Sequence, residues 1–193
     1  PNEQDFCKLT RVLRYLNGTK ASSLRIAPKS IDIHIDIDAS FGTRSKAESQ
    51  YGYNLFLGNS LLHAKSAKLK FNVKSSTEAE TIATSESVGS AIWINNLLAC
   101  IHIQGKTPVA RNAISVGQDN QSCIRMHTEG PKYSSATRHL HIKHFWLRNL
   151  IDRDEIVMRY TPTEFMTADF LTKPLAKELF YKHIKEIGII IRP

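Results

Sequence analysis

The sequence lacks several features that define common classes of protein. It contains only three cysteines, without the spacing of metal ligands, so we expect neither a disulfide framework nor a zinc module. Cys7, Cys100 and Cys123 instead favour a reducing compartment and a role as structural thiols. No apolar run approaches the roughly 20 residues of a membrane-spanning helix, and residues 1–20 contain no apolar core of a signal peptide. We therefore expect no membrane partner.

The composition is that of a folded chain with an excess of positive charge. Hydrophobic residues make up 41% of the 193 residues and charged residues 23%, which argues against disorder. This length fits one domain with attachments, or two small domains. Lys and Arg total 26 against 18 Asp and Glu, a net charge of +8 that favours an anionic partner such as nucleic acid. The chain begins with Pro1 rather than Met, so we expect a fragment of a longer protein.

Hydrophobic periodicity predicts a helix followed by an antiparallel meander. Apolar side chains recur at helical spacing within residues 1–20, and residues 21–30 form a connector. Four isoleucines then alternate with polar residues, which is the period of a β-strand. The predicted strands of the meander cover 30–38, 51–58 and 61–67, the last two joined by a turn.

The second half of the chain predicts alternating helices and strands. A long helix begins near Ser75, where Thr77 and Glu80 have the spacing of a capping box, and it runs to about Ala99. Its predicted apolar stripe consists of Ala79, Ile82, Ala83, Trp93, Leu97 and Cys100. The further predicted elements are a strand at 112–117, a short helix, a helix at 135–151, a strand at 155–161, a helical region containing Asp169 and a helix at 177–187. Five aromatic residues are predicted to lie mostly in the core: Tyr51, Tyr53, Phe56, Trp93 and Trp146.

This order of elements predicts an α/β fold. Three strands of a meander are followed by strands that alternate with helices, which indicates a mixed five-stranded sheet flanked by helices.

Four acidic residues stand at the ends of predicted elements. Asp38 and Asp119 end strands, Glu80 lies in the first turn of the long helix, and Asp169 begins the last helical region. Carboxylates that converge at one sheet edge repel by about 4 kcal/mol per pair at 4 Å, and divalent cations such as Mg²⁺ or Mn²⁺ remove that penalty. Such residues are also common for structural reasons, and the pattern alone does not rank Asp32 and Asp36 below Asp38.

Six segments together resemble a known family. The chain is similar to the ribonuclease H domain of copia-like long-terminal-repeat retrotransposons, in the right order and over nearly its whole length. The matching segments are Asp38-Ala39-Ser40-Phe41-Gly42, SSTEAE (75–80) with Ala83, Asp119-Asn120-Gln121-Ser122, RHLHI (138–142) with FWLR (145–148), and ADFLTKPL (168–175). RVLRYLNGT (11–19) resembles the end of the reverse transcriptase that precedes this domain.

The resemblance implies a ribonuclease H fold, an antiparallel meander followed by parallel strands, and hydrolysis of the RNA strand of RNA–DNA hybrids with two metal ions. These would be Mg²⁺, with Mn²⁺ as an alternative. Carried over by position, the catalytic and metal-binding residues are Asp38, Glu80, Asp119 and Asp169, whereas Glu78 is a helix cap. The first and fourth strands are neighbours in this fold, which places Asp38 beside Asp119. Expected substrate contacts are Ser40, Lys65, Lys74, Ser76, Asn120, Gln121 and His139.

The resemblance also implies an organisation and partners. Residues 1–29 would be the tail of a reverse transcriptase, 30–174 the ribonuclease H domain, and 175–193 a C-terminal helix and tail. The expected partners are an RNA–DNA hybrid and the reverse transcriptase domain of the same polyprotein. The expected location is a cytoplasmic virus-like particle, with the nucleus as an alternative.

The chain departs from the family at several positions. Ser40 and Phe41 stand where Asp and Trp are frequent, Gln118 stands where Cys is frequent, and His141 and His144 replace an Asp and an aromatic residue. The loop at 160–164 has no histidine, so no general acid is assigned. No catalytic carboxylate is lost.

Several alternatives stay open at this point. The domain could be a catalytically silent module that binds hybrids for reverse transcriptase, or another two-metal nuclease of the same fold. The lysine cluster Lys65, Lys68, Lys70 and Lys74 could contact phosphates or block pairing of an edge strand. A zinc site at His139, His141 and His144 is disfavoured, because histidines two positions apart point to different faces of a helix.

Overall fold

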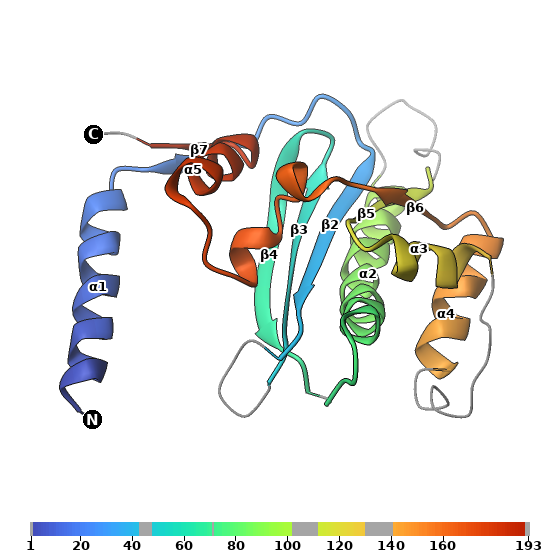
Figure 1. Ribbon diagram of the computed structural model, residues 1–193. Coiled ribbons are helices and arrows are strands. Elements are labelled where there is room, and N and C mark those ends of the chain that lie inside the picture. Colours follow the sequence, from blue (N-terminus) through green and yellow to red (C-terminus); the bar gives the residue numbers. More distant parts are fainter. Residues whose placement is uncertain (1, 43–47, 71, 102–111, 130–140, 192–193) are drawn as a thin grey trace.

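The structure is a computed structural model that describes residues 2–42, 48–70, 72–101, 112–129 and 141–191. Its centre is a five-stranded sheet with the strand order β4-β3-β2-β5-β6 (Figure 1). The strands are β2 (Ile33–Ser40), β3 (Gln50–Leu57), β4 (Ser60–Lys68), β5 (Ile114–Gln118) and β6 (Ile156–Tyr160). β2, β3 and β4 form an antiparallel meander, and β5 and β6 are parallel to β2. The predicted fold class and the predicted adjacency of the first and fourth strands of the sheet are confirmed.

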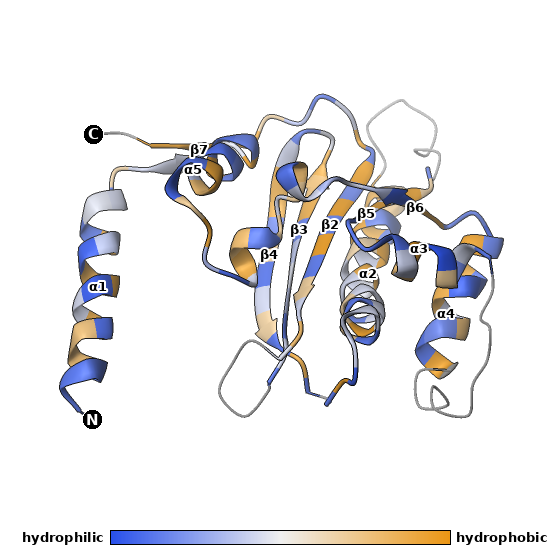
Figure 2. Ribbon diagram, viewed as in Figure 1, coloured by the Kyte–Doolittle hydropathy of each residue, from blue (hydrophilic) through white to orange (hydrophobic). Residues whose placement is uncertain are grey.

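The isoleucines of β2 bury one face of this sheet. Ile33, Ile35 and Ile37 are at most 3% exposed and belong to the main apolar core. Alternating hydrophobic and hydrophilic bands are visible along the central strands in Figure 2, as expected for side chains that point to opposite faces in turn. The core also receives side chains from α2 (Ser76–Cys100) and α4 (His141–Asp152), while α3 (Gln121–Thr128) contacts both helices.

The opposite face of the sheet is covered by the C-terminal part of the chain. Phe56 and Leu61 pack there against Ile184 and Ile187 in a second apolar cluster. The elements on this side are two short 3₁₀ turns, η3 (Thr163–Phe165) and η4 (Asp169–Leu171), and the helix α5 (Lys177–Glu186). The helical region predicted around Asp169 thus consists of two single turns.

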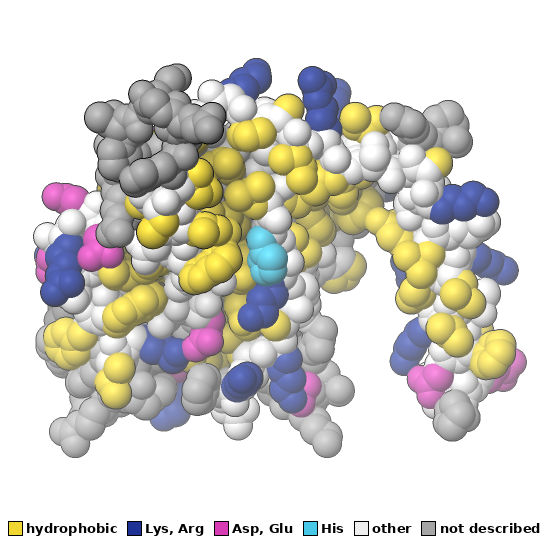
Figure 3. Space-filling model, turned by 180° about the vertical axis from the view of Figure 1, so that it is seen from behind, with side chains coloured by type: hydrophobic (Ala, Val, Ile, Leu, Met, Phe, Trp, Pro, Cys, Tyr) yellow, Lys and Arg dark blue, Asp and Glu magenta, His cyan; other side chains and the backbone are white. Residues whose placement is uncertain are grey.

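The N-terminal helix α1 (Glu3–Thr19) stands apart from the sheet (Figure 1). None of its residues is buried, and apolar side chains line it in the space-filling view of Figure 3. A short antiparallel pair, β1 (Ser23–Leu24) with β7 (Ile189–Ile190), connects this region to the end of the chain. Within the described residues, no helix has the length and apolar character that crossing a membrane requires.

The long helix corrects two sequence-based predictions. Its N-cap is Ser75, whose side chain accepts from the backbone N–H of Glu78, so the capping box predicted at Thr77 and Glu80 is wrong. The apolar stripe is buried only in the first half of the helix. Trp93 is 63% exposed, and Leu97 and Cys100 are exposed too, because they lie on the side of α2 that also carries the exposed Glu86, whereas Ile94 and Leu98 of the same half pack against the core.

Three smaller predictions also differ from the structure. Cys7 is exposed, so of the three cysteines only Cys123 is a buried thiol. Trp146 is 36% exposed, whereas Tyr51, Tyr53 and Phe56 are buried as predicted. The predicted helix at 135–151 begins at His141 in the structure, and residues 135–140 lie outside the described part of the chain.

Candidate active site

Asp38 lies near the C-terminal end of β2, at the middle of the sheet. Since the isoleucines of β2 face α2, Asp38 and Asp36 point to the other face. Asp38 is 3% exposed, and the hydroxyl of Thr172 donates a hydrogen bond to its carboxylate. The strand pattern therefore places a buried acid on the face that the C-terminal segment covers.

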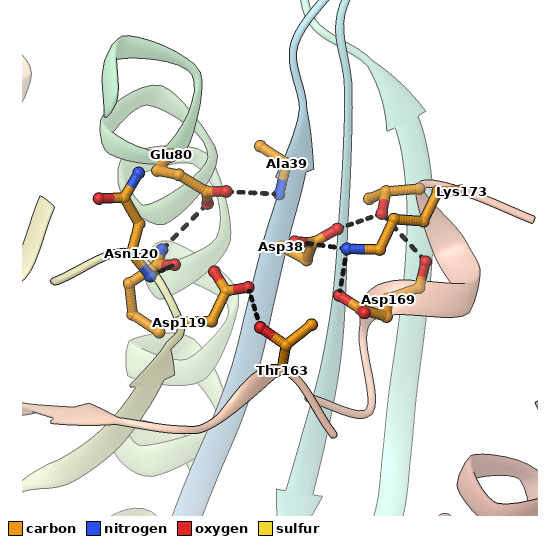
Figure 4. A network of polar contacts seen from close by, with 10 residues as sticks. Asp38, Ala39, Glu80, Asp119, Asn120, Thr163, Asp169 and Lys173 are labelled. Carbon is orange, nitrogen blue, oxygen red and sulfur yellow. Dashed lines mark hydrogen bonds and ion pairs between the residues drawn. The ribbon is translucent and has the colours of Figure 1, made fainter. Parts of the chain in front are cut away.

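Glu80 reaches the same region from the fifth residue of α2, just after its first turn. Its Oε1 accepts from the backbone N–H of Ala39 at 3.1 Å, and its Oε2 accepts from Nε2 of Gln118 at 3.0 Å. Glu80 is 4% exposed, so it is held between β2 and β5 (Figure 4). The nearby Glu78 accepts from the backbone N–H of Lys74 at 2.7 Å, so it holds the chain just before the N-cap residue, Ser75.

Asp119 directly follows β5 and completes a group of three carboxylates. Carboxylate oxygens of Asp38, Glu80 and Asp119 all lie within 4.8 Å of one another. Thr163 Oγ1 donates to Oδ2 of Asp119 at 3.2 Å, which ties the first residue of η3 to the group. The structure thus brings together three of the four acidic residues that the sequence predicts.

Asp169, the fourth predicted acid, lies on the other side of Asp38 (Figure 4). It is 1% exposed, and the Nζ atom of Lys173 lies 2.9 Å from its Oδ1. The same ammonium group is 4.0 Å from Oδ1 of Asp38. Asp38 therefore belongs to two groups of acids. One contains Glu80 and Asp119, and the other contains Asp169, with the ammonium group of Lys173 beside both of its acids.

Burial and mutual repulsion oppose ionisation of these acids. The pKa of Glu80 is raised well above its ordinary value, first by burial and then by the charge of Asp38. Burial is also the main reason that the pKa values of Asp38, Asp119 and Asp169 are raised. A cation bound among them would favour the ionised forms. The donors are all carboxylate oxygens, a set that suits hard divalent cations such as Mg²⁺ and Mn²⁺.

Sequence reasoning missed four polar residues that orient the acids: Gln118, Thr163, Thr172 and Lys173. One signal was available for Lys173, since Asp169 and Lys173 have the i,i+4 spacing of a helical ion pair. The other three contacts join residues that are distant in sequence, which no local pattern reveals.

Asp36, which the sequence could not rank against Asp38, has a structural role. Its carboxylate accepts from Thr167 Oγ1 at 2.6 Å and contacts His34 Nε2 at 2.6 Å. Asp32 lies before β2, exposed, and accepts from the amide of Asn112. Neither belongs to the group of three converging carboxylates.

The predicted substrate contacts divide into several locations. Ser76 and Gln121 are exposed first residues of α2 and α3, and Lys74 is exposed just before α2. Asn120 caps α3 by accepting from the N–H of Cys123 at 3.0 Å, and Ser40 is 7% exposed at the end of β2.

The remaining two predicted contacts are Lys65 and His139. Lys65 lies on the α2 face of the sheet, 5.6 Å from the ring centroid of Tyr51, so it is not brought next to Asp38. His139 lies outside the described residues.

His144 of α4 packs against another histidine, His127 of α3. The Nδ1 atoms of His144 and His127 are 3.0 Å apart, and their rings stack at 4.9 Å between centroids. Burial and the neighbouring ring lower the pKa of His127 to about 3, so His127 is neutral near pH 7. This pair joins α4 to α3.

Known proteins similar to this chain are parts of transposon polyproteins. The chain is 29% identical over its full length to a retrovirus-related Pol polyprotein from the Arabidopsis thaliana transposon RE2, and 26% identical over 93% of its length to that of the Nicotiana tabacum transposon TNT 1-94. It is also 30% identical, over 74% of its length, to the Gag-Pol polyprotein of the Saccharomyces cerevisiae transposon Ty1-JR1. It spans only 13% of each plant relative and 8% of the yeast one. No family model matches the chain.

Solved structures with a similar fold are ribonucleases H. The RNase H1 of the archaeon Halobacterium salinarum matches 73% of this chain and 94% of its own with a TM-score of 0.51 at 16% identity. LC11-RNase H1 matches the same shares with a TM-score of 0.52 at 16% identity. The sequence relatives and the structural neighbours agree with the resemblance seen in the motifs. The chain is therefore homologous to a segment of retrotransposon Pol polyproteins, and it has the ribonuclease H fold.

Proposed function

We propose that this domain hydrolyses the RNA strand of RNA–DNA hybrids during reverse transcription of a copia-like retrotransposon. The observation that carries the proposal is the convergence of Asp38, Glu80 and Asp119, whose carboxylate oxygens lie within 4.8 Å at the ends of β2 and β5 and the start of α2. The same constellation lies in a ribonuclease H fold and in a homologue of Pol polyproteins, which supports a nuclease. Fold alone does not set function, so the acidic site is the decisive feature.

Two Mg²⁺ ions, or Mn²⁺ ions, are part of this proposal. Asp38, Glu80 and Asp119 would hold one ion, and Asp38 with Asp169 would hold the other, since Asp38 is common to both groups of acids. Bound divalent cations would activate a water molecule and stabilise the leaving oxygen of the phosphodiester, giving 3′-hydroxyl and 5′-phosphate ends. The buried, mutually repelling carboxylates fit this role, because a cation would offset their repulsion.

The residues around the acids orient them for this reaction. Gln118 and the backbone N–H of Ala39 fix both oxygens of Glu80, and Thr163 fixes Asp119. The 160–164 loop has no histidine, so we assign no protein group as the general acid. The chain's contribution is thus the positioning and electrostatics of a rigid acidic site.

The hybrid is proposed to lie across the first turns of α2 and α3. Ser76 and Gln121 are exposed there, beside Glu80 and Asp119 respectively. LC11-RNase H1, which has the same fold, has been solved in complex with an RNA/DNA hybrid. Contacts of this kind recognise the shape and the 2′-hydroxyl groups of a hybrid rather than its sequence.

The remaining partner is a reverse transcriptase. We propose that α1 is the tail of the polymerase region of the same polyprotein, and that the reaction takes place in a cytoplasmic virus-like particle, with the nucleus as an alternative. The small share of the relatives' length that this chain spans supports a larger parent protein.

Cleavage of a labelled hybrid tests the proposal. We expect the protein to cut the RNA strand in Mg²⁺, and Asp38→Asn to lose this activity by at least about a hundredfold. The matched control is Asp32→Asn, which removes an exposed carboxylate just before the same strand and should retain cleavage. Equal activity of wild type and Asp38→Asn would refute the catalytic assignment. Binding of hybrid without cleavage in Mg²⁺ or Mn²⁺ would indicate a silent binding module, and cleavage of duplex DNA would indicate another nuclease of this fold.

A further inference from the structure

The ammonium group of Lys173 lies between two of the four acidic side chains. Its Nζ atom is 2.9 Å from Oδ1 of Asp169 and 4.0 Å from Oδ1 of Asp38, and Figure 4 shows it reaching between them. Asp169 and Asp38 are 1% and 3% exposed, whereas the side chain of Lys173 is 38% exposed. Two buried carboxylates therefore share one partly exposed cation.

The chain segment that carries Lys173 is fixed against the sheet. Side chains from β3 and β4 both donate to the carbonyl oxygen of Leu171. The hydroxyl of Thr172 donates to the carboxylate of Asp38 and, at 3.0 Å, to the carbonyl oxygen of Asp169. The backbone N–H of Lys173 donates to that same carbonyl oxygen at 3.1 Å. The backbone of Lys173 is thus held beside both acids, and only its long side chain is free to turn.

The charges of these three residues favour one another. Burial lowers the pKa of Lys173, but the negative charges of Asp38 and Asp169 raise it by more, so the pKa of Lys173 is raised. In return, Lys173 favours the ionised forms of Asp38 and Asp169, against the burial that raises their pKa values. The ammonium group provides for this pair of acids the neutralisation that a metal ion would provide.

We propose that Lys173 competes with a divalent cation for the position between Asp38 and Asp169. In the free domain the ammonium group occupies this position, so divalent cations bind in a fixed order. The first binds at Asp38, Glu80 and Asp119, and the second binds more weakly, when Lys173 withdraws. The inference rests on the proposed function, because it concerns the same carboxylates.

Withdrawal of Lys173 is compatible with its surroundings. An ammonium group and a divalent cation repel strongly at distances near 3 Å, so both cannot occupy the position at once. The side chain of Lys173 is partly exposed and has a flexible four-carbon stem, which allows it to turn toward solvent while Asp169 stays in place. The second cation must therefore break the ion pairs of Lys173, and removal of the ammonium group should strengthen that binding step.

Calorimetric titration of the complete chain with Mg²⁺ and Ca²⁺, without nucleic acid, tests the proposal on Lys173→Met. The matched control is Lys182→Met, because the side chain of Lys182 is also 38% exposed and also forms an i,i+4 pair, with Glu186. We expect Lys173→Met to bind a second cation at least about tenfold more tightly than wild type, and Lys182→Met to behave like wild type. The same number of cations with the same affinities in wild type and Lys173→Met would overturn the proposal.

A measurement on the wild-type protein tests the same idea without a substitution. An amine-reactive reagent followed by mass spectrometry reports how accessible each lysine is. We expect Lys173 to react slowly in the presence of a chelator and faster once Mg²⁺ saturates the protein, while Lys182 reacts equally in both. A rate at Lys173 that does not rise with Mg²⁺ would overturn the competition.

These experiments separate the inference from the proposed function. Neither measures cleavage, so a protein that binds cations as expected but leaves hybrids intact would contradict only the proposed function. If neither wild type nor Lys173→Met binds any divalent cation, the metal site itself is refuted, and the competition with it.

Discussion

Gln118 donates from Nε2 to Oε2 of Glu80 at 3.0 Å, and it is fully buried while doing so. The carbonyl oxygen of the same side chain, Oε1, accepts from the backbone N–H of Asn120 at 3.1 Å. One amide at the end of β5 therefore holds both an acid of the site and the residue that caps α3. This position often carries Cys in copia-like domains, and a thiol could not make both contacts at these distances.

Replacing Gln118 with Met should destabilise the protein by about 1–3 kcal/mol, because the buried carboxylate of Glu80 and the N–H of Asn120 each lose a partner. Met keeps a similar length and leaves no large cavity. Urea denaturation measures the change, with Gln121→Met as the control, since Gln121 is exposed and should change stability by no more than about 0.5 kcal/mol. Equal stabilities of the two variants would contradict the role assigned to Gln118.

Divalent cations should stabilise the folded protein. Asp38, Glu80 and Asp119 repel one another when ionised, so a cation that binds only the folded state adds stability, by about 2.7 kcal/mol at a concentration 100 times its dissociation constant. The raised pKa values set the dependence on pH, because protons compete with the cation as the pH falls toward them. The stabilisation by Mg²⁺ should therefore decrease on acidification, and the decrease should begin at a higher pH than it would for carboxylates with ordinary pKa values.

The melting temperature in Mg²⁺ and in EDTA at matched ionic strength measures this gain. Asp38→Asn should lose most of it, since Asp38 belongs to both groups of acids. The same gain in Asp38→Asn and in wild type would show that Mg²⁺ acts elsewhere on the protein.

The strands of the central sheet were readable from the sequence because their side chains alternate. The isoleucines of β2 bury one face of the sheet, and this period fixes which residues face α2. The C-terminal half of α2 was predicted less well. Its apolar residues have helical spacing, but Ile94 and Leu98 pack against the core while Trp93 is exposed, because the way the helix is turned on the sheet is a tertiary property.

The acids of the site were identified through motifs, and their partners were not. Asp38 and Asp36 occupy equivalent places in the pattern of β2, and only the contacts of Asp36 with His34 and Thr167 show that it is structural. The ion pair of Asp169 with Lys173 could be predicted from their i,i+4 spacing. The contact of Lys173 with Asp38 could not, because it depends on how the 169–173 segment packs on the sheet. Side chains that meet across long sequence separations are what sequence patterns cannot supply.

Acid should destabilise the protein through His127. Its pKa is lowered to about 3 in the folded state, against about 6.5 when the chain is unfolded, so the unfolded state binds more protons between these values. The free energy of unfolding should therefore fall as the pH drops from about 6.5 toward 3, by up to about 1.4 kcal/mol per pH unit from this residue.

Urea denaturation of wild type and His127→Gln across this pH range isolates the contribution of His127. We expect a smaller loss of stability on acidification in His127→Gln than in wild type. The control is His63→Gln, which replaces an exposed histidine on β4 and should follow wild type. Parallel curves for wild type and His127→Gln would rule out a neutral buried histidine at this position.

Gly52 allows the segment with Asp169 and Lys173 to approach the sheet. It pairs with Asp38 across β2 and β3, and a Cβ atom at Gly52 would lie 2.5 Å from Cβ of Leu171. Gly52→Ala should therefore push η4 away from the sheet and cost about 1–3 kcal/mol, as overpacking does in other cores. Because Asp169 moves with η4, hybrid cleavage should fall by more than the loss of folded protein explains.

The control is Gly89→Ala in the middle of α2, where no atom lies within 4 Å of the added Cβ, so this change should stabilise by about 0.5–1 kcal/mol. Denaturation curves and cleavage rates of both variants decide the matter, and a Gly52→Ala protein as stable and as active as wild type would show that η4 does not depend on this close approach.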